Sequence, residues 1–410
     1  MGYKQDAIKG VTWLGAFRII TRIISFIRTA IIARVLTPAD FGVFGIASLA
    51  LSFIEVFTET GINIFLIQQR DEIDSYIDTA WIVSILRGIV IALLIFFLAP
   101  YISLFFQAKQ AELSLQVMAL IPLARGFINP SVAKFIKDLE FYKEFYYRTS
   151  IFIVESITTL IFVFISPHSL SLVLGLVVGA IFEAILSFFL AKPTPHYIFK
   201  KKLFFKVLHY GKWLTLAGIF DYLYQNIDNI IVGKILGTAP LGLYNMGYRI
   251  SSIPISEFSD VLSRATFPVY AKISHDKNRL LKAFYKSLGI TVLLVLPISI
   301  IFFIWPVLIV EILLGHKWIS IVPILKILAL FGSLRAILYI VNGLFYSVHR
   351  QDVVTKIAFI SFLGLFIPII PLIHLWGTSG AALSALIGTI IAYPVSGYYY
   401  YQIFHKNPDY

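Results

Sequence analysis

The chain of 410 residues contains no cysteine, and only 14% of its residues are charged. The absence of cysteine excludes disulfides, thiolate metal sites and a thiol nucleophile, so neither redox nor zinc-thiolate chemistry is expected. The scarcity of charge excludes a soluble domain of this size. Apolar surface takes its place, because 59% of the residues are hydrophobic and the mean hydropathy is +0.85.

Apolar runs long enough to cross a bilayer, each about 20 residues or more, recur along the whole chain. Twelve such runs are found, at 11–36, 41–66, 80–106, 113–133, 146–166, 170–191, 213–236, 240–268, 287–314, 318–347, 354–376 and 378–403. The sequence therefore predicts an all-α integral membrane protein with about twelve transmembrane helices and little chain outside them.

Basic residues are distributed unevenly between the two sets of loops. Both tails and one set of loops hold most of the Lys and Arg, whereas the opposite loops hold Arg34, Lys109, Lys234 and Lys317. By the positive-inside rule, both termini are cytoplasmic, which requires an even number of helices. The net charge of +12 then reflects cytoplasmic loops beside anionic membrane lipids, and nucleic acid is not an expected partner.

The two halves of the chain match each other in order. Residues 13–14, 95–100 and 115–125 align with 213–214, 301–306 and 325–335, at offsets of 200, 206 and 210. Six helices per repeat is an even number, so both halves insert with the same orientation and form two parallel-repeat six-helix lobes around a central cavity. The predicted boundaries are 1–191 for the first lobe, 192–212 for a basic cytoplasmic linker and 213–410 for the second lobe.

The first apolar run carries three arginines, Arg18, Arg22 and Arg28, on one helical face. Each such charge costs about 2.5 to 3.5 kcal/mol in the middle of a membrane helix, so the face must meet carboxylates, water or an anionic substrate. Surplus arginine favours anions, and the planar guanidinium fits phosphate oxygens, which makes a diphosphate a suitable ligand.

Further charged residues lie within other runs and complete the predicted site. The predicted cationic cavity contains Arg18, Arg22, Arg28, Arg249 and Arg264, and the candidate cavity or coupling acids are Glu55, Glu59, Asp221, Asp228 and Asp260. Glu55 and Glu59 stand one turn apart, a spacing suited to pairing with the arginines of the first run. The acids would titrate or bind a coupling proton or sodium ion, or would only neutralise the arginines; the sequence leaves these alternatives open. No catalytic residue, metal site or cofactor is predicted.

Single charges elsewhere allow structural interpretations. Arg87, Arg148 and Lys326 are interpreted as snorkelling side chains or as marks of shifted helix ends. Arg125 and Arg335 occupy matched repeat positions, where a structural role and a substrate role are equally supported. The segment 274–288 alternates leucine and phenylalanine with basic residues, which predicts an amphipathic helix on the cytoplasmic surface.

Three segments resemble the polysaccharide transporter family, the Wzx-type flippases of the superfamily that also contains multidrug and toxin extrusion antiporters. They are Leu36-Thr37-Pro38-Ala39-Asp40-Phe41-Gly42-Val43-Phe44-Gly45 after the arginine-bearing run, 228–245 in the seventh and eighth runs, and 267–270 before the ninth. The chain also departs from the family, because several relatives carry two further C-terminal helices and this sequence ends after twelve runs. A lipid-tail groove built from such helices cannot be assumed here.

The resemblance implies that the chain moves polyprenyl-diphosphate-linked oligosaccharide from the inner to the outer leaflet of the cytoplasmic membrane by alternating access. Expected partners are this glycan carrier, membrane lipids and other polysaccharide-assembly proteins. A cation-coupled multidrug antiporter of the same superfamily is the first alternative, although its helices would be expected to carry carboxylates for cationic ligands rather than arginines. A membrane glycan-processing enzyme is the second, although the predicted outer loops are too short to hold a catalytic domain.

Overall fold

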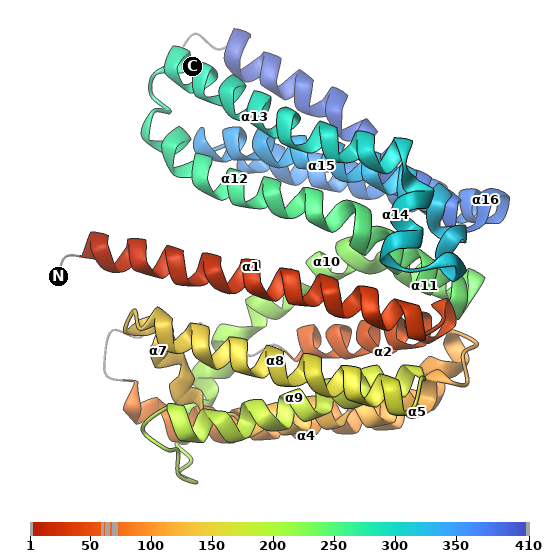
Figure 1. Ribbon diagram of the computed structural model, residues 1–410. Helices are drawn as coiled ribbons and strands as arrows, with labels where there is room; N and C mark the ends of the chain where they lie inside the picture. The colour runs from red at the N-terminus through yellow and green to blue at the C-terminus, as the bar shows by residue number, and fades with distance from the viewer. Residues whose placement is uncertain (1–2, 59–60, 62–65, 68–72, 407–410) are drawn as a thin grey trace. The chain divides into compact units, whose positions relative to one another are not determined.

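The computed structural model describes residues 3–58, 61, 66–67 and 73–406, and all regular elements in these residues are helical (Figure 1). Seven of the described helices are long and apolar enough to cross a membrane, or eight if the bent pair Ala111–Gly126 and Pro130–Lys137 forms one broken span. A helix covers at least part of each of the twelve predicted apolar runs. The predicted all-α membrane fold is confirmed.

The chain divides into two compact units, Met1–Asn226 and Ile227–Tyr410. The division falls inside α10 (Lys201–Leu236), which extends twelve residues before the predicted start of its span at 213. Much of the predicted linker 192–212 is therefore helical. The predicted lobe boundaries, 1–191 and 213–410, stay a prediction.

The first unit contains the arginine-bearing helix and the helices that pack beside it. Its helices include α1 (Tyr3–Val35), which carries the arginines, α2 (Pro38–Phe57), α4 (Asp74–Phe105), α5 (Ala111–Met118), α6 (Leu120–Gly126), α7 (Ala133–Lys137), α8 (Phe141–Ile165) and α9 (Ser169–Leu190). Helix α8 packs along both α1 and α9, and α6 packs on α4 and α9. Charged side chains on these helices are thereby brought within reach of one another.

The start of α2 shows what the Leu36–Gly45 motif does locally. Thr37 caps the helix, because its hydroxyl accepts a hydrogen bond from the Asp40 backbone while the Asp40 carboxylate accepts one from the Thr37 backbone. Pro38 occupies the first helical turn, where its missing N–H costs nothing. Asp40 also accepts a hydrogen bond from the backbone of Ser169, so this motif joins the beginnings of α2 and α9.

The second unit repeats the pattern of long helices joined by short breaks. It contains the end of α10 followed by α11 (Thr238–Gly247), α12 (Ile253–Lys272), α13 (Lys277–Ile304), α14 (Pro306–Leu313), α15 (Val322–Ser347) and α16 (Gln351–Tyr401). Helix α16 loses helical geometry at Trp376 and Gly377, where Gly377 adopts a φ of 56°. This break separates the last two predicted spans, 354–376 and 378–403, as expected.

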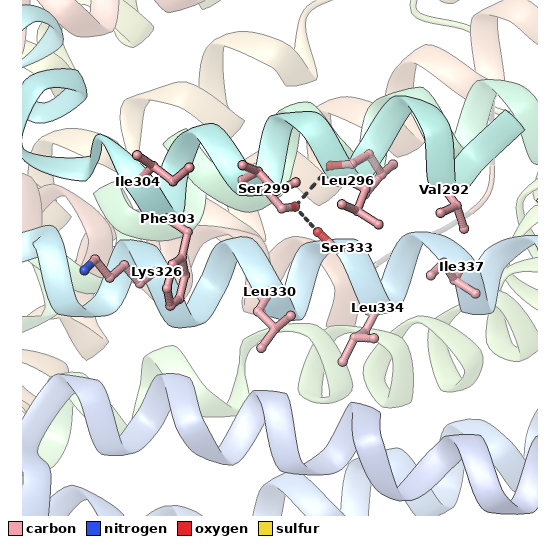
Figure 2. Close-up of a pocket in the computed structure, with 12 residues that line it drawn as sticks. Val292, Leu296, Ser299, Phe303, Ile304, Lys326, Leu330, Ser333, Leu334 and Ile337 are labelled. Carbon is pink, nitrogen blue, oxygen red and sulfur yellow. Dashed lines mark hydrogen bonds between the residues drawn. The ribbon is translucent and has the colours of Figure 1, made fainter. Parts of the chain in front are cut away.

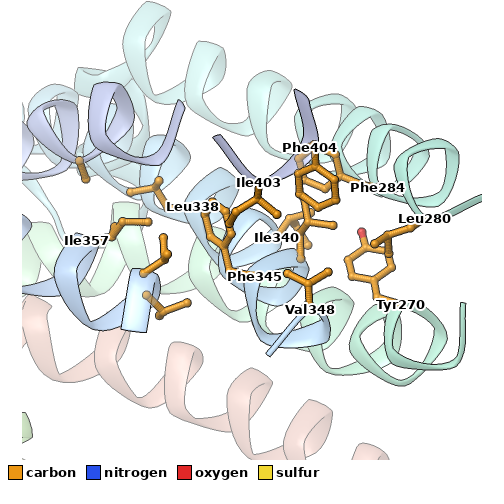
Figure 3. Close-up of a cluster of buried hydrophobic side chains, with 14 residues drawn as sticks. Tyr270, Leu280, Phe284, Leu338, Ile340, Phe345, Val348, Ile357, Ile403 and Phe404 are labelled. Carbon is orange, nitrogen blue, oxygen red and sulfur yellow. The ribbon is translucent and has the colours of Figure 1, made fainter. Parts of the chain in front are cut away.

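A cluster of buried side chains joins α12, α13, α15 and α16 in the second unit (Figure 3). Leu280 and Phe284 of α13 pack there against Phe345 of α15 and Phe404 beyond α16. The prediction of a separate surface helix at 274–288 is wrong, because Lys277–Ile304 is one continuous helix and its apolar face is covered by protein. An amphipathic pattern does not by itself tell a protein neighbour from a lipid surface.

Candidate functional site

Helix α1 carries its three arginines in two different environments. The Nη1 atom of Arg28 lies 2.7 Å from Glu155 Oε1 on α8 and 3.3 Å from Ser156 Oγ, and its guanidinium lies 5.2 Å from the centre of the Phe152 ring. Both charged side chains are only 16% exposed. Arg28 therefore forms a tight ion pair inside the first unit with an acid of α8, and the pairing of Glu55 and Glu59 with the arginines of α1 stays a prediction.

Arg18 and Arg22 stand on the same helix as Arg28, one turn apart, and both side chains are exposed. Their neighbours Ile19 and Ile23 are also exposed, at 63% and 55%. This stretch of α1 thus presents two cations within an apolar surface. Binding of substrate by Arg18, Arg22 and Arg28 stays a prediction.

A charged cavity of about 490 Å³ lies within the first unit, enclosed by residues of α2, α4, α6, α8 and α9. We name it the charged cavity, and its ionisable side chains besides Tyr147 are Glu55, Arg87, Arg125, Glu144, Arg148 and Glu183. Three arginines and three glutamates balance each other in formal charge. Such a group inside a membrane protein marks a functional site or a structural ion network.

Arg125 of α6 is the least tightly held cation of the charged cavity. Its Nε lies 3.4 Å from Glu183 Oε2 on α9, and its Nη1 lies 3.7 Å from Glu55 Oε1 on α2. Both distances exceed the 2.7–2.9 Å of a close charge-assisted hydrogen bond. The Arg125 side chain is 46% exposed. It is therefore shared between two carboxylates without a close bond to either, and a small rearrangement would transfer it to another anion.

The other two arginines of the cavity are bound closely. Arg87 donates from Nε to the Thr58 carbonyl at 2.8 Å and from Nη2 to the Glu55 carbonyl at 2.9 Å, so it binds the last carbonyls of α2. Arg148 pairs with Glu144, one turn earlier on α8. Arg87 therefore joins α4 to the end of α2, whereas the pair of Arg148 and Glu144 lies within α8.

Small residues let α4 and α6 approach closely behind the cavity. A Cβ atom on Gly88 would lie 2.5 Å from the Pro122 carbonyl oxygen and 3.0 Å from the Cα of Gly126. Only glycine fits at this crossing. The two helices are thus held against each other next to Arg87 on α4 and Arg125 on α6.

In the second unit, the predicted coupling acid Asp228 is buried and fully partnered. Its Oδ2 accepts a hydrogen bond from the Tyr244 hydroxyl at 2.8 Å, and its Oδ1 accepts from the backbone N–H of Asn229 at 2.8 Å. Asp228 is only 5% exposed. This geometry is that of a structural hydrogen-bonded carboxylate.

The remaining predicted residues are dispersed. Asp221 is exposed and accepts from Gln225 at 2.7 Å, and Arg249 is exposed in the short segment Tyr248–Ser252 between α11 and α12. Glu59 lies outside the described residues, as do the side chains of Asp260 and Arg264. Of the predicted residues whose side chains the structure describes, only Glu55 lines the charged cavity.

Sequence reasoning missed most of the charged cavity. Arg87, Glu144, Arg148 and Glu183 come from three helices that are far apart in the sequence, and none has a motif around it. The one available signal was the matched repeat position of Arg125 and Arg335. In the second unit, Arg335 donates to the Tyr248 hydroxyl at 2.7 Å and lies over the Phe331 and Tyr339 rings.

Comparison with solved structures defines the class of protein. The fold matches the structure titled "Lipid II flippase MurJ, inward closed conformation" with a TM-score of 0.70 at 16% identity, over 94% of this chain and 87% of that one. It matches an inward-facing multidrug resistance MATE family transporter of the MOP superfamily with a TM-score of 0.68 at 12% identity, over 97% and 99%. The chain shares the fold of these two proteins.

The family follows from the sequence itself. Residues 31–323 match the family described as "Polysaccharide biosynthesis protein", and the chain belongs to this family. The lipopolysaccharide biosynthesis protein WzxC of Escherichia coli (strain K12) is 25% identical over 98% of this chain and 84% of its own length. The teichuronic acid biosynthesis protein TuaB of Bacillus subtilis (strain 168) is 23% identical over 82% and 70%. The family resemblance predicted from the sequence is confirmed.

Proposed function

We propose that this chain moves a polyprenyl-diphosphate-linked oligosaccharide from the inner to the outer leaflet of the cytoplasmic membrane, by alternating access, for the assembly of a cell-surface polysaccharide. Family membership supports this function, as do relatives named for lipopolysaccharide and teichuronic acid biosynthesis. On this proposal the chain is a transporter and not an enzyme, and both termini are cytoplasmic. Other polysaccharide-assembly proteins supply its substrate and take up its product.

The observation that carries the proposal is the exposed pair Arg18 and Arg22 on α1. Each arginine in a membrane helix costs about 2.5 to 3.5 kcal/mol, and this cost is offset when an anion binds beside it. A guanidinium donates two parallel hydrogen bonds to phosphate oxygens, so two guanidinium groups one turn apart suit a diphosphate. Arg28, which is tightly paired with Glu155, would instead hold α1 against α8.

We assign the charged cavity to coupling. A proton or sodium ion on Glu55 or Glu183 would weaken its attraction for Arg125 and shift that arginine toward the other carboxylate. Because these three side chains stand on three different helices, such a shift would change the contacts between α2, α6 and α9. This offers a physical link between an ion gradient and helix movement.

A reconstituted transport assay tests the proposed function. The purified full chain is placed in liposomes with a fluorescent short-chain polyprenyl diphosphate sugar, and exposure of the sugar on the far leaflet is followed. We expect transport by the wild type, a loss of at least tenfold in Arg18→Ala and Arg22→Ala, and partial activity in Arg22→Lys. Uptake of organic cations without sugar transport would replace the proposal with the multidrug antiporter.

Two control variants separate charge from general disturbance. Ile23→Ala changes an exposed residue on the same turn of α1 without changing charge, and Lys282→Ala removes an exposed cation from α13. Both are expected to transport at the wild-type rate. Equal activity in the two arginine variants and both controls, at matched protein levels, would contradict the role of α1.

A further inference from the structure

An apolar groove of about 490 Å³ lies in the second unit between α13 and α15 (Figure 2). We name it the α13–α15 groove. It runs from Val292 and Ile337 at one end to Ile304 and Lys326 at the other. With a rise of 1.5 Å per residue, the twelve steps from Val292 to Ile304 span about 18 Å. This length is close to half of the roughly 30 Å hydrocarbon core of a bilayer, so the groove fits within one leaflet.

The groove presents almost no polar groups to an occupant. Its two serines, Ser299 and Ser333, hydrogen bond to each other across the groove, as Figure 2 shows. Ser299 also bonds to the Val295 carbonyl, and Ser333 bonds to the Ala329 carbonyl. Because these hydroxyls are satisfied within the protein, a polar ligand would gain nothing here and water would not be held. The groove therefore selects a hydrocarbon chain.

Lys326 marks one end of the groove. Its Nζ lies 5.2 Å from the centre of the Phe303 ring, and its aliphatic stem forms part of the wall. A lysine at this place can reach toward the membrane surface and attract the anionic group of a lipid whose chain fills the groove. Charge complementarity thus indicates an anionic head group, with its phosphate near Lys326.

The groove is a channel between two helices, which suits a lipid with a single chain. Helices α13 and α15 pack together near Phe284 and Phe345 in the cluster of Figure 3, and the groove opens beyond that cluster. Val295, which lines the groove, also packs against Ala336 of α15 and Ile255 of α12. A phospholipid would place one of its two chains in a channel between two helices, whereas an isoprenoid phosphate would place its only chain there.

We propose that the α13–α15 groove binds the isoprenoid chain of the transported lipid, with Lys326 beside its diphosphate. This inference rests on the proposed function. Helix α13 starts with basic residues, which the positive-inside rule places on the cytoplasmic side, so the Lys326 end faces the outer surface. The groove is then a product site in the outer leaflet.

Photo-cross-linking tests the assignment directly. The full chain in liposomes is illuminated with a polyprenyl diphosphate that carries a diazirine in its isoprenoid chain, and labelled peptides are identified by mass spectrometry. We expect labels at 292–304 and 326–337 that are removed by unlabelled polyprenyl diphosphate and persist with a tenfold excess of phosphatidylglycerol. Equal competition by phosphatidylglycerol would overturn the proposal, because ordinary lipid would then fill the groove.

Variants with matched controls extend the test. Leu330→Trp fills the groove, and Leu293→Trp adds the same side chain to the 73% exposed neighbouring face of α13, outside the groove. We expect at least a fivefold rise in KM for a long-chain substrate in Leu330→Trp, no change for a short-chain substrate, and no change in Leu293→Trp. Equal effects of the two variants, or equal effects on both chain lengths, would overturn the assignment.

Substitutions of Lys326 test the role of the charge at the end of the groove. Lys326→Gln should lower labelling by at least threefold, Lys326→Arg should restore it, and Lys286→Gln, at an exposed cation of α13, should leave it unchanged. Failure of the groove and failure of the proposed function are distinguishable. Specific labelling without any sugar transport would contradict the function alone, and transport with labels spread evenly over α13 would contradict the groove alone.

Discussion

Helices α1 and α10 occupy matched positions in the two repeats, yet their matched residues differ in charge. At the offset of 200 residues, Arg18, Arg22 and Arg28 correspond to Gly218, Tyr222 and Asp228. Arg28 and Asp228 are each paired within their own unit, Arg28 with Glu155 and Asp228 with Tyr244. Arg18 and Arg22, which are exposed, have no cationic counterpart. On the predicted repeat, α1 therefore differs from its matched helix in carrying exposed arginines at these positions.

A second matched pair of helices differs in how closely it packs. In the first unit, α4 and α6 cross at Gly88 and Gly126, where no Cβ atom fits on Gly88. At offsets of 206 and 210, these glycines correspond to Leu294 and Ala336 of α13 and α15. Leu294 is 46% exposed, and the α13–α15 groove lies between these two helices. The first helix pair thus lines the charged cavity, whereas the matched pair lines an apolar groove.

The largest loss of stability is expected when the glycine at the crossing of α4 and α6 is replaced by the leucine of its matched position. Gly88→Leu places a side chain where even a Cβ atom would lie 2.5 Å from a carbonyl oxygen, which should cost about 3 kcal/mol or more and reduce the yield of folded protein. Leu294→Ala, at an exposed matched position, should change the free energy of unfolding by less than about 0.5 kcal/mol. Size-exclusion profiles and thermal midpoints in detergent measure both. Equal stability of the two variants would contradict the tight crossing of α4 and α6.

The next loss of stability is expected when Arg28 of α1 or Asp228 of α10 loses its partner. Arg28→Ala leaves Glu155 without its cation and should cost about 3 kcal/mol, whereas Tyr244→Phe removes one hydrogen bond to Asp228 and should cost about 2 kcal/mol. Unfolding in mixed micelles measures the two losses.

Double-mutant cycles show whether each loss belongs to the pair. Arg28→Ala combined with Glu155→Ala, and Tyr244→Phe combined with Asp228→Asn, should each be less destabilising than the sum of the single changes. Additive losses would mean that these residues do not act together. A loss of transport in Arg28→Ala without any loss of stability would instead support a role of Arg28 in binding the substrate.

The contrast between these helices also shows what the sequence could predict. Hydrophobic runs located the spans and the last break, because they depend on local composition. Helical periodicity placed the three arginines on one face but did not identify the helix opposite them. Glu155, which is 127 residues away from Arg28, became its partner only because α8 packs along α1.

The charged cavity was beyond sequence reasoning for the same reason. Its members come from five helices, and whether Arg148 points to lipid or to Glu144 depends on packing that no local pattern encodes. The repeat was the one non-local signal in the sequence. It marked Arg125 and Arg335 as matched, although it could not tell that one would lie between carboxylates and the other among aromatic rings.

These two arginines provide the last and smallest test of the difference between the repeats. Arg125→Ala removes the cation shared by Glu55 and Glu183 and should slow transport about tenfold while the fold persists, because Arg87 still joins α4 to the end of α2. Arg335→Ala removes a hydrogen bond and two ring contacts, so it should cost about 1 kcal/mol of stability and change transport less than twofold. The liposome assay and thermal midpoints measure both variants. If Arg335→Ala slowed transport as much as Arg125→Ala, the matched arginines would share one function, and the contrast between carboxylate and aromatic surroundings would not decide their roles.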